Sequence, residues 1–343
     1  MVVKKTYTLT FILLSSCLLL CWLINISLGS VTIPLPEIFT SLIGGETSKD
    51  TWHYIITNYR LPKSFTAILA GSGLSISGLL MQTLFRNPLA GPFVLGISSG
   101  ASLGVAILIL GLSIFGGSLA GLAFSSVGMA LAASIGAFLV LSAVMLVARK
   151  LKNTMSILII GLMFGSLTGA VISVLSYFSN ADQLQQFIFW SFGNLGNLSW
   201  TELGLFFGVY LIAIVLVITI IKPLNSLLLG ENYAQSLGIN LKYTRNVTLI
   251  ATGLLTGVIT AFSGPIAFVG LAVPHLTKLV FNTSNHKTLL PAVAIIGAMV
   301  MLIGDTIAQV PTSEYTLPIN AVTSIFGAPI VIWLLVRKKS IHY

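Results

Sequence analysis

Long apolar runs, separated by short polar breaks, dominate the pattern along this chain of 343 residues. The runs lack the alternation of a half-buried strand, and each is about as long as a helix that crosses a bilayer, which takes about 20 apolar residues. A helix also satisfies its own backbone hydrogen bonds, as lipid requires. The pattern predicts ten membrane-spanning helices, at residues 9–28, 62–84, 93–111, 119–148, 155–178, 203–221, 246–263, 266–282, 289–309 and 317–336.

Composition supports an all-α polytopic membrane protein. The chain is 56% hydrophobic and only 7% charged, whereas soluble domains carry about 25% charged residues, which excludes a water-soluble fold. Lys4 and Lys5 precede the first apolar run like the start of a signal peptide, but the run is too long and lacks a small-residue cleavage site. We interpret it as a retained first span. Cys17 and Cys21, one turn apart within it, predict apolar surface and neither a disulfide nor a metal site.

The positions of the charged residues predict an orientation. With the N-terminus inside, 14 of the 17 Lys and Arg residues fall in inner loops, and only Lys49, Arg60 and Lys63 fall in outer ones. Such a bias is the positive-inside rule. The formal net charge of +9 is therefore a topology signal, it does not indicate nucleic-acid binding, and both termini are predicted to be cytoplasmic.

Two Gly-Pro breaks relate the halves of the chain. Gly91-Pro92 follows the second span and Gly264-Pro265 follows the seventh. Under the predicted topology the first break lies inside and the second outside. The chain is thus expected to be one transmembrane domain of two inverted halves, about 1–200 and 201–343. Inverted repeats with broken helices are typical of transporters.

The sequence offers no catalytic set. It contains no Gly-x4-Gly-Lys-Ser/Thr loop, no His-Glu-x-x-His pair and no Cys/His cluster with metal-ligand spacing. The chain is therefore not expected to be an enzyme, to hydrolyse ATP, or to hold a cofactor or metal of its own.

Two ionisable residues fall inside predicted spans. Asp305 would cost about 2.5–3.5 kcal/mol at a helix centre and so needs a partner or water. It is either a proton or ion relay or a structural hydrogen-bonding group, and the apparent lack of an intramembrane cation to pair with it favours the structural role. His275, after Pro274, is expected to make a polar contact at a helix end, and Asn87-Pro88 forms a polar break after the second span.

Small residues recur at every fourth position of the fifth span: Gly161, Gly165, Gly169 and Ser173. Such a stripe usually means close helix packing. The alternative is a smooth, uncharged wall along a path for a bulky substrate. The two interpretations are compatible if one side of the stripe packs against a helix and the other side lines the path.

The polar segment at about 224–242 predicts two short helices jointed at Gly230. Glu231 suits the positive N-terminus of the second helix, and Gly238 suits its C-terminal cap. An apolar ridge, too short to span a membrane, would face the cytoplasm. Its members are Leu227, Leu228, Tyr233, Ala234 and Leu237. The ridge is either a docking site for another protein or an interfacial helix that lies on lipid.

Several motifs, in order, resemble the permease subunits of FecCD-type ABC importers for iron-siderophores, haem and cobalamin. The resemblance runs from about residue 30 to the C-terminus. Its motifs are RLPK and NPLAGPFVLGISSGA within 60–101, FWSFGNL at 189–195, LLLGENYAQSLGI at 227–239, GPIAFVGLAVPHL at 264–276 and LPINAVTSIFGAPIVIWLL at 317–335. Three patterns of the family are altered: Lys278 and Gln309 stand where many members have arginine, and Thr316–Asn320 replaces Glu-Leu-Pro-x-Gly.

The resemblance implies an architecture and a set of partners. It implies ten helices per subunit, a permease homodimer in the bacterial inner membrane, two ATPase subunits that bind ATP and Mg, and an extracytoplasmic binding protein. An iron-siderophore is the expected substrate, with cobalamin or haem as alternatives. The different classes that remain are an ion-coupled secondary transporter that uses Asp305 and a structural membrane scaffold.

The resemblance also assigns roles to individual residues. It places Arg60 and Lys63 in binding-protein docking, and Asn87, Pro88, Pro274, His275 and Asp305 are taken as structural polar groups. The residues that it implies for ATPase coupling are Leu228, Gly230, Glu231, Ala234, Leu237 and Gly238. Those along the translocation path are Gln82, Gly96, Ser98, Ser99, Gly100, Gly161, Gly165 and Gly169.

Overall fold

A computed structural model describes residues 7–29, 31, 33–45, 47–111, 125–151, 154–196, 198–310 and 315–337. Within these ranges the chain is helical and contains no strand. The prediction of an all-α membrane protein is confirmed. Lys4, Lys5 and the start of the predicted span at 119–148 lie outside the described residues.

Each of the ten predicted spans contains a helix. Seven are long and apolar enough to cross a membrane: α1 (Thr8–Ser27), α4 (Leu61–Leu84), α8 (Ser126–Ala148), α9 (Thr154–Phe178), α11 (Trp200–Thr219), α14 (Leu241–Ser263) and α16 (His286–Ala308). Three apolar helices are shorter: α5 (Ile97–Ile109), α15 (Val269–Phe281) and α17 (Ile319–Arg337).

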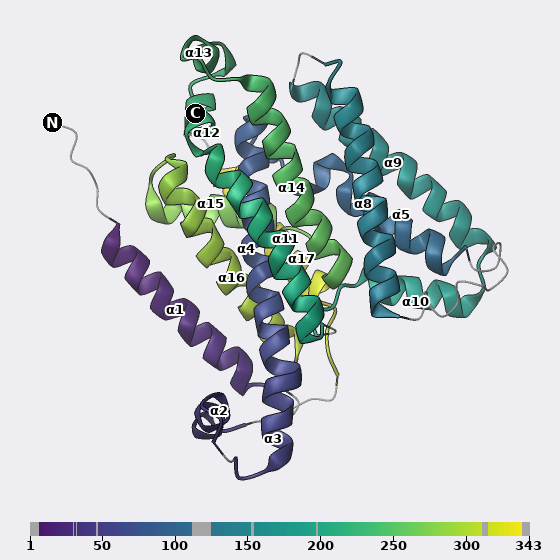
Figure 1. Ribbon diagram of the computed structural model, residues 1–343, viewed down its shortest axis with the longest axis vertical. Coiled ribbons are helices and arrows are strands. Elements are labelled where there is room, and N and C mark those ends of the chain that lie inside the picture. Colours follow the sequence, from purple (N-terminus) through teal and green to yellow (C-terminus); the bar gives the residue numbers. More distant parts are fainter. Residues whose placement is uncertain are drawn as a thin grey trace.

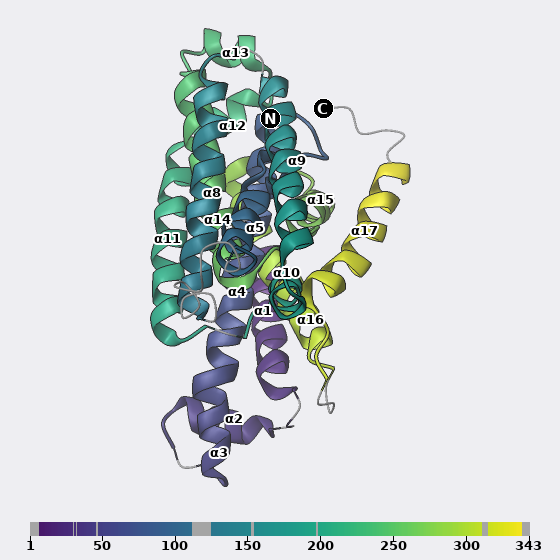
Figure 2. The same cartoon turned by 90° about the vertical axis from the view of Figure 1, so that its right-hand side faces the viewer.

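Shorter elements lie at the two ends of the bundle (Figure 1). At one end, the α2 end, are α2 (Leu35–Leu42), α3 (Asp50–Ile55), a π-helical turn η1 (Ile56–Arg60) that continues into α4, and α10 (Ala181–Ser191). At the opposite end, the α13 end, are α12 (Ile221–Leu227) and α13 (Glu231–Ser236). Figure 2 shows α17 leaning away from the rest of the bundle.

The two Gly-Pro breaks produce matching, inverted structures. α4 begins beside α3 at the α2 end, whereas α14 begins beside α13 at the opposite end, so the two helices run in opposite directions (Figure 1). Each is followed by an irregular segment and a helix of 13 residues, α5 or α15. Gly96, with φ +70°, joins the 3-10 turn η2 (Pro92–Leu95) to α5. Phe268, with φ 64°, precedes α15. These left-handed residues let the chain turn where a continuous helix would run on.

α4 lies at the centre of the bundle, and nearly all its residues are buried. A Cβ atom on Gly71 would lie 2.2 Å from the carbonyl oxygen of Gly297 in α16, and one on Gly78 would lie 1.6 Å from that of Gly270 in α15. The backbones therefore touch at both crossings, which only small residues permit. α5 and α8 cross in the same way, because a Cβ on Gly136 would lie 2.1 Å from the Gly100 carbonyl oxygen.

Candidate functional site

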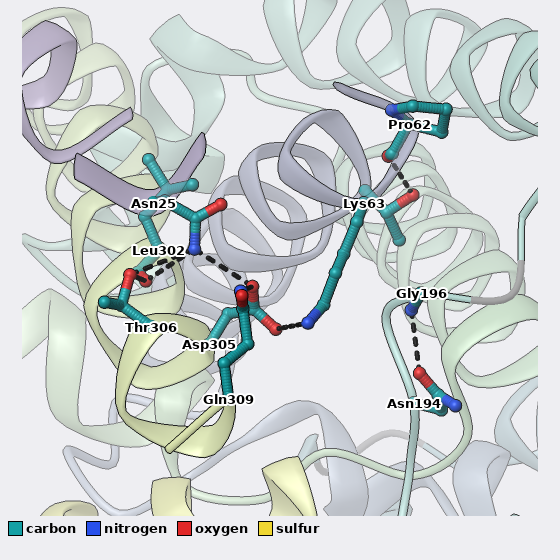
Figure 3. A network of polar contacts seen from close by, with 10 residues as sticks. Asn25, Pro62, Lys63, Asn194, Gly196, Leu302, Asp305, Thr306 and Gln309 are labelled. Carbon is teal, nitrogen blue, oxygen red and sulfur yellow. Dashed lines mark hydrogen bonds and ion pairs between the residues drawn. The ribbon is translucent and has the colours of Figure 1, made fainter. Parts of the chain in front are cut away.

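Polar side chains gather where α1, α4 and α16 meet at the α2 end (Figure 3). Lys63, in the first turn of α4, forms an ion pair with Asp305 of α16, with Nζ 3.1 Å from Oδ1. The other carboxylate oxygen of Asp305 accepts hydrogen bonds from Asn25 Nδ2 (2.9 Å) and Gln309 Nε2 (2.7 Å). The Asp305 side chain is 3% exposed and that of Lys63 is 23% exposed. This carboxylate therefore joins three helices.

The ion pair corrects one sequence-based expectation. Asp305 was expected to lack an intramembrane cation, but Lys63, 242 positions earlier in the chain, supplies one. With a cation and two amide donors in place, the carboxylate is satisfied without water, as a buried charge requires. The geometry agrees with the structural role that the sequence favoured for Asp305.

Arg60 binds the end of α1. Its Nη1 donates to the carbonyl oxygens of Ile26 and Ser27, and its Nη2 donates to that of Val31. Arg60 thus satisfies carbonyl groups that the last turn of a helix leaves unpaired, where a cation also suits the helix dipole. The residue is buried, at 9% exposed, so most of its surface is engaged within this chain.

A cavity of about 760 Å³ opens beside this cluster. Its lining includes Arg60, Lys63 and Asp305 together with residues of the segments 189–196 and 316–319. Docking of a binding protein by Arg60 and Lys63 stays a prediction. The structure adds that both cations already have partners within the chain, and that Gln309 donates to Asp305.

The segment at the α13 end has the predicted joint. Gly230 lies between α12 and α13 with φ +107° and ψ 154°, a conformation that L side chains rarely adopt. α13 starts at Glu231 and ends in a Schellman motif: the Gly238 N–H donates to Gln235 O (3.0 Å) and the Ile239 N–H to Ala234 O (3.1 Å). Gly238, with φ +78°, is the left-handed residue that this motif uses.

The exposed ridge differs in membership from the prediction. Ala234 is fully buried and Leu227 is 5% exposed, because both side chains pack inward against the bundle. Leu228 is half-buried. The exposed ridge, here called the coupling ridge, consists of Leu229 (64%), Tyr233 (51%) and Leu237 (55%). Leu229 was missed, although its spacing of four from Tyr233 and of eight from Leu237 was a usable signal.

The predicted path residues divide into packed and open positions. Gly96, Gly100 and Gly161 are buried, and a Cβ on Gly161 would lie 2.1 Å from the carbonyl oxygen of Val94. These three therefore make close helix contacts within this chain, and their place along a path stays a prediction. Gly165 has only Ser99 Oγ nearby, at 3.5 Å from a Cβ, and Gly169 has nothing within 4 Å. The stripe on α9 packs at one end and is open at the other.

The remaining predicted residues make contacts between helices or within loops. Ser98 Oγ lies 3.3 Å from Thr260 Oγ1 of α14, and Gln82 Nε2 donates to Leu271 O of α15 (3.2 Å). His275 Nε2 lies 2.7 Å from the carbonyl oxygen of Pro88; because a carbonyl only accepts, Nε2 carries the proton. Asn87 Oδ1 accepts from the N–H of Leu89 (2.9 Å), and Pro274 lies inside α15. The described residues include no group of three or more His, Cys, Asp or Glu placed to hold a metal ion.

A family model and similar relatives point to the same family of transport proteins. The model of the FecCD transport family matches residues 17–337. The vitamin B12 import system permease protein BtuC of Salmonella paratyphi A is 35% identical over 329 residues, which cover 92% of this chain and 95% of the relative. BtuC of Salmonella typhimurium shows the same identity and coverage.

Two solved structures have similar folds. An inward-facing metal-chelate type ABC transporter matches with a TM-score of 0.84 and 29% identity, covering 96% of this chain and all of that one. PsaBC from Streptococcus pneumoniae in complex with Fab matches with a TM-score of 0.53 over 88% of this chain and 95% of that one, and at 16% identity it supports the fold alone. With the family model covering nearly the whole chain, this polytopic helical protein belongs to the FecCD transport family.

Proposed function

We propose that this chain is the membrane-spanning permease of an ATP-driven importer for a metal chelate. The observation that carries the proposal is the coupling ridge. Leu229, Tyr233 and Leu237 present exposed apolar surface on α13 and the turns that flank it, a segment too short to cross a bilayer. Exposed apolar patches mark interaction sites, and an importer of this family needs a surface through which its ATPase drives the permease.

The relatives guide the choice of substrate. The sequence alone favoured an iron-siderophore, whereas the BtuC relatives are named for vitamin B12 import and the structural neighbour for metal chelates. Cobalamin is accordingly our first candidate, a ferric siderophore the second and haem the third. All three are bulky chelates that a largely uncharged path suits.

The partners follow from the proposed function. Two ATPase subunits would bind ATP and Mg and contact the coupling ridge. An extracytoplasmic binding protein would dock at the α2 end, where Arg60 and Lys63 line the cavity, and a second copy of the permease would complete the path. This places the α13 end in the cytoplasm of a bacterium and the α2 end outside its inner membrane.

An ion-coupled mechanism through Asp305 has less support. A relay group must exchange protons or ions with water, but Asp305 is 3% exposed and is held by Lys63, Asn25 and Gln309. These contacts engage both carboxylate oxygens of Asp305, as a structural role requires.

A substitution in the coupling ridge tests the proposal. Tyr233→Lys places a charge in the centre of the ridge and is expected to abolish co-purification of the ATPase and ATP-dependent uptake of radiolabelled cobalamin. Asn232→Lys adds the same charge at the neighbouring exposed position, outside the ridge, and serves as the matched control. Equal membrane levels of both proteins show that insertion is intact. Normal uptake by the Tyr233→Lys protein would contradict the assignment.

A further inference from the structure

A short hydrogen bond ties the start of α9 to α13. Thr154, the first residue of α9, donates from Oγ1 to Oε1 of Glu231, the first residue of α13, over 2.6 Å. Thr154 is 9% exposed, so the bond is largely shielded from water. A hydrogen bond to a carboxylate is roughly twice as strong as one between neutral groups. It joins residues that are 77 positions apart in the sequence and belong to two different helices.

α12 is tied to a different part of the molecule. Asn225 Oδ1 accepts from both the backbone N–H and Nδ1 of His286, at 2.9 Å and 2.7 Å. Because Nδ1 thereby carries the proton, Nε2 accepts from Thr83 Oγ1 at 2.8 Å. His286 and Thr83 are both buried and belong to α16 and α4, so α12 is fixed to the centre of the bundle.

Between the two ties lies the joint at Gly230. A Cβ there would meet only Arg86 Nη1, at 3.7 Å, so the joint is sterically open and its backbone is in a region that glycine alone adopts readily. The two halves of the segment therefore differ in their side-chain hydrogen bonds: α12 is bonded to α16, whereas α13, which packs on the bundle through Ala234, is bonded to α9.

α9 itself is loosely held. Only Thr154, Ile157, Gly161 and Thr168 of its 25 residues are buried. Its backbone lies against that of η2 at Gly161, where a Cβ atom would be 2.1 Å from the Val94 carbonyl oxygen, whereas a Cβ atom on Gly169 would have nothing within 4 Å. Gly161 is thus the natural pivot of this helix. With 1.5 Å of rise per residue, the helix extends about 10 Å from the pivot to Thr154 and about 25 Å from the pivot to Phe178.

From this arrangement we propose that Thr154 and Glu231 are positioning residues through which α13 moves α9. A displacement of α13 about Gly230 pulls the start of α9, α9 tilts about Gly161, and its far end moves in the opposite direction by about 2.5 times as much. α12 stays in place because Asn225 and His286 hold it. The inference rests on the proposed function, since the force would come from the ATPase at the coupling ridge.

The first test needs only the full-length chain in lipid nanodiscs. Thr154→Val removes the donor and keeps the shape of the side chain. It is expected to increase hydrogen exchange of the backbone amides at 158–161 about tenfold or more, whereas Thr154→Ser is expected to restore protection. Ser226→Ala, which removes a hydrogen bond within α12 at the same end, is the matched control and is expected to change nothing at 158–161. Unchanged exchange in the Thr154→Val chain would overturn the proposal.

The second test separates this link from the importer function. In the assembled transporter, Thr154→Val is expected to retain ATP hydrolysis while the amount of cobalamin transported per ATP falls several-fold, and Thr154→Ser is expected to recover it. An unchanged ratio would contradict the link alone, leaving the importer assignment intact. Failure of the wild-type chain to bind an ATPase would contradict the importer assignment, while the exchange result would still report on the tie between α13 and α9.

Discussion

Removal of the two partners of the Lys63–Asp305 ion pair is expected to have unequal effects. Lys63→Met leaves the Asp305 carboxylate, 3% exposed, without its cation, whereas Asp305→Asn leaves the Lys63 ammonium, 23% exposed, beside an open cavity. An unpaired charge that can reach water is solvated again at little cost. An unpaired charge that stays buried either destabilises the fold by its lost solvation or is neutralised by taking up a proton.

The exposures set the magnitudes. Breaking a buried ion pair by removing one partner costs about 3–5 kcal/mol, and Lys63→Met is expected near the lower end, about 3 kcal/mol, because Asn25 and Gln309 still donate to Asp305. Asp305→Asn keeps an acceptor for Asn25 and frees the ammonium to turn to water, so about 1–2 kcal/mol is expected. The double variant strands no charge and is expected to lose about 1–2 kcal/mol, less than Lys63→Met alone.

Thermal unfolding in detergent, followed by circular dichroism, measures these differences. The expected order of unfolding temperature is wild type, then Asp305→Asn and the double variant, and last Lys63→Met. Equal losses in the two single variants, with additive loss in the double variant, would refute the reasoning, because they would mean that the two charges do not depend on each other.

Two further predictions concern packing and pH. Gly78→Ala puts a methyl group 1.6 Å from the Gly270 carbonyl oxygen, and α4 and α15 would have to separate by about 1.7 Å to restore an ordinary contact. The expected loss of stability in thermal unfolding is about 3 kcal/mol or more. The control Gly208→Ala, with nothing within 4 Å of the new Cβ atom, is expected to be neutral or stabilising. Hydrogen bonds from the side chain and backbone of Ser48 hold the pKa of Glu37 below its ordinary value. The stabilisation by this carboxylate is therefore present above the ordinary pKa of about 4.3 and is lost as pH falls through the lowered pKa. Ser48→Ala is expected to raise the pKa of Glu37 in a carbon-13 NMR titration, and an unchanged pKa would contradict this.

The helices and their breaks were largely predictable from sequence. Apolar run length sets the spans, and Gly91-Pro92 and Gly264-Pro265 interrupt the helices where the structure has irregular segments. The joint at Gly230 and the cap at Gly238 were likewise predictable, because glycine is strongly favoured where φ is positive. These features depend on neighbouring residues in the chain.

Contacts between distant segments were not predictable in this way. Lys63 and Asp305 lie 242 positions apart, and no local pattern indicates that they meet. Gly161 and Gly169 belong to one stripe with one spacing, yet Gly161 touches a backbone and Gly169 has open space. The difference arises because η2 lies against α9 at Gly161 and not at Gly169. Ala234 appeared in the predicted ridge because its spacing fits a helix face, but the bundle decides which face is covered.

Uptake driven separately by ATP and by a proton gradient tests the central claim most directly. Cells that carry the permease and its partners would be given radiolabelled cobalamin or a ferric siderophore. We expect uptake to continue when a protonophore collapses the gradient while ATP is maintained, and to stop when ATP is depleted while the gradient remains. Uptake that survives ATP depletion but stops with the protonophore and with Asp305→Asn would contradict the account in favour of ion-coupled transport.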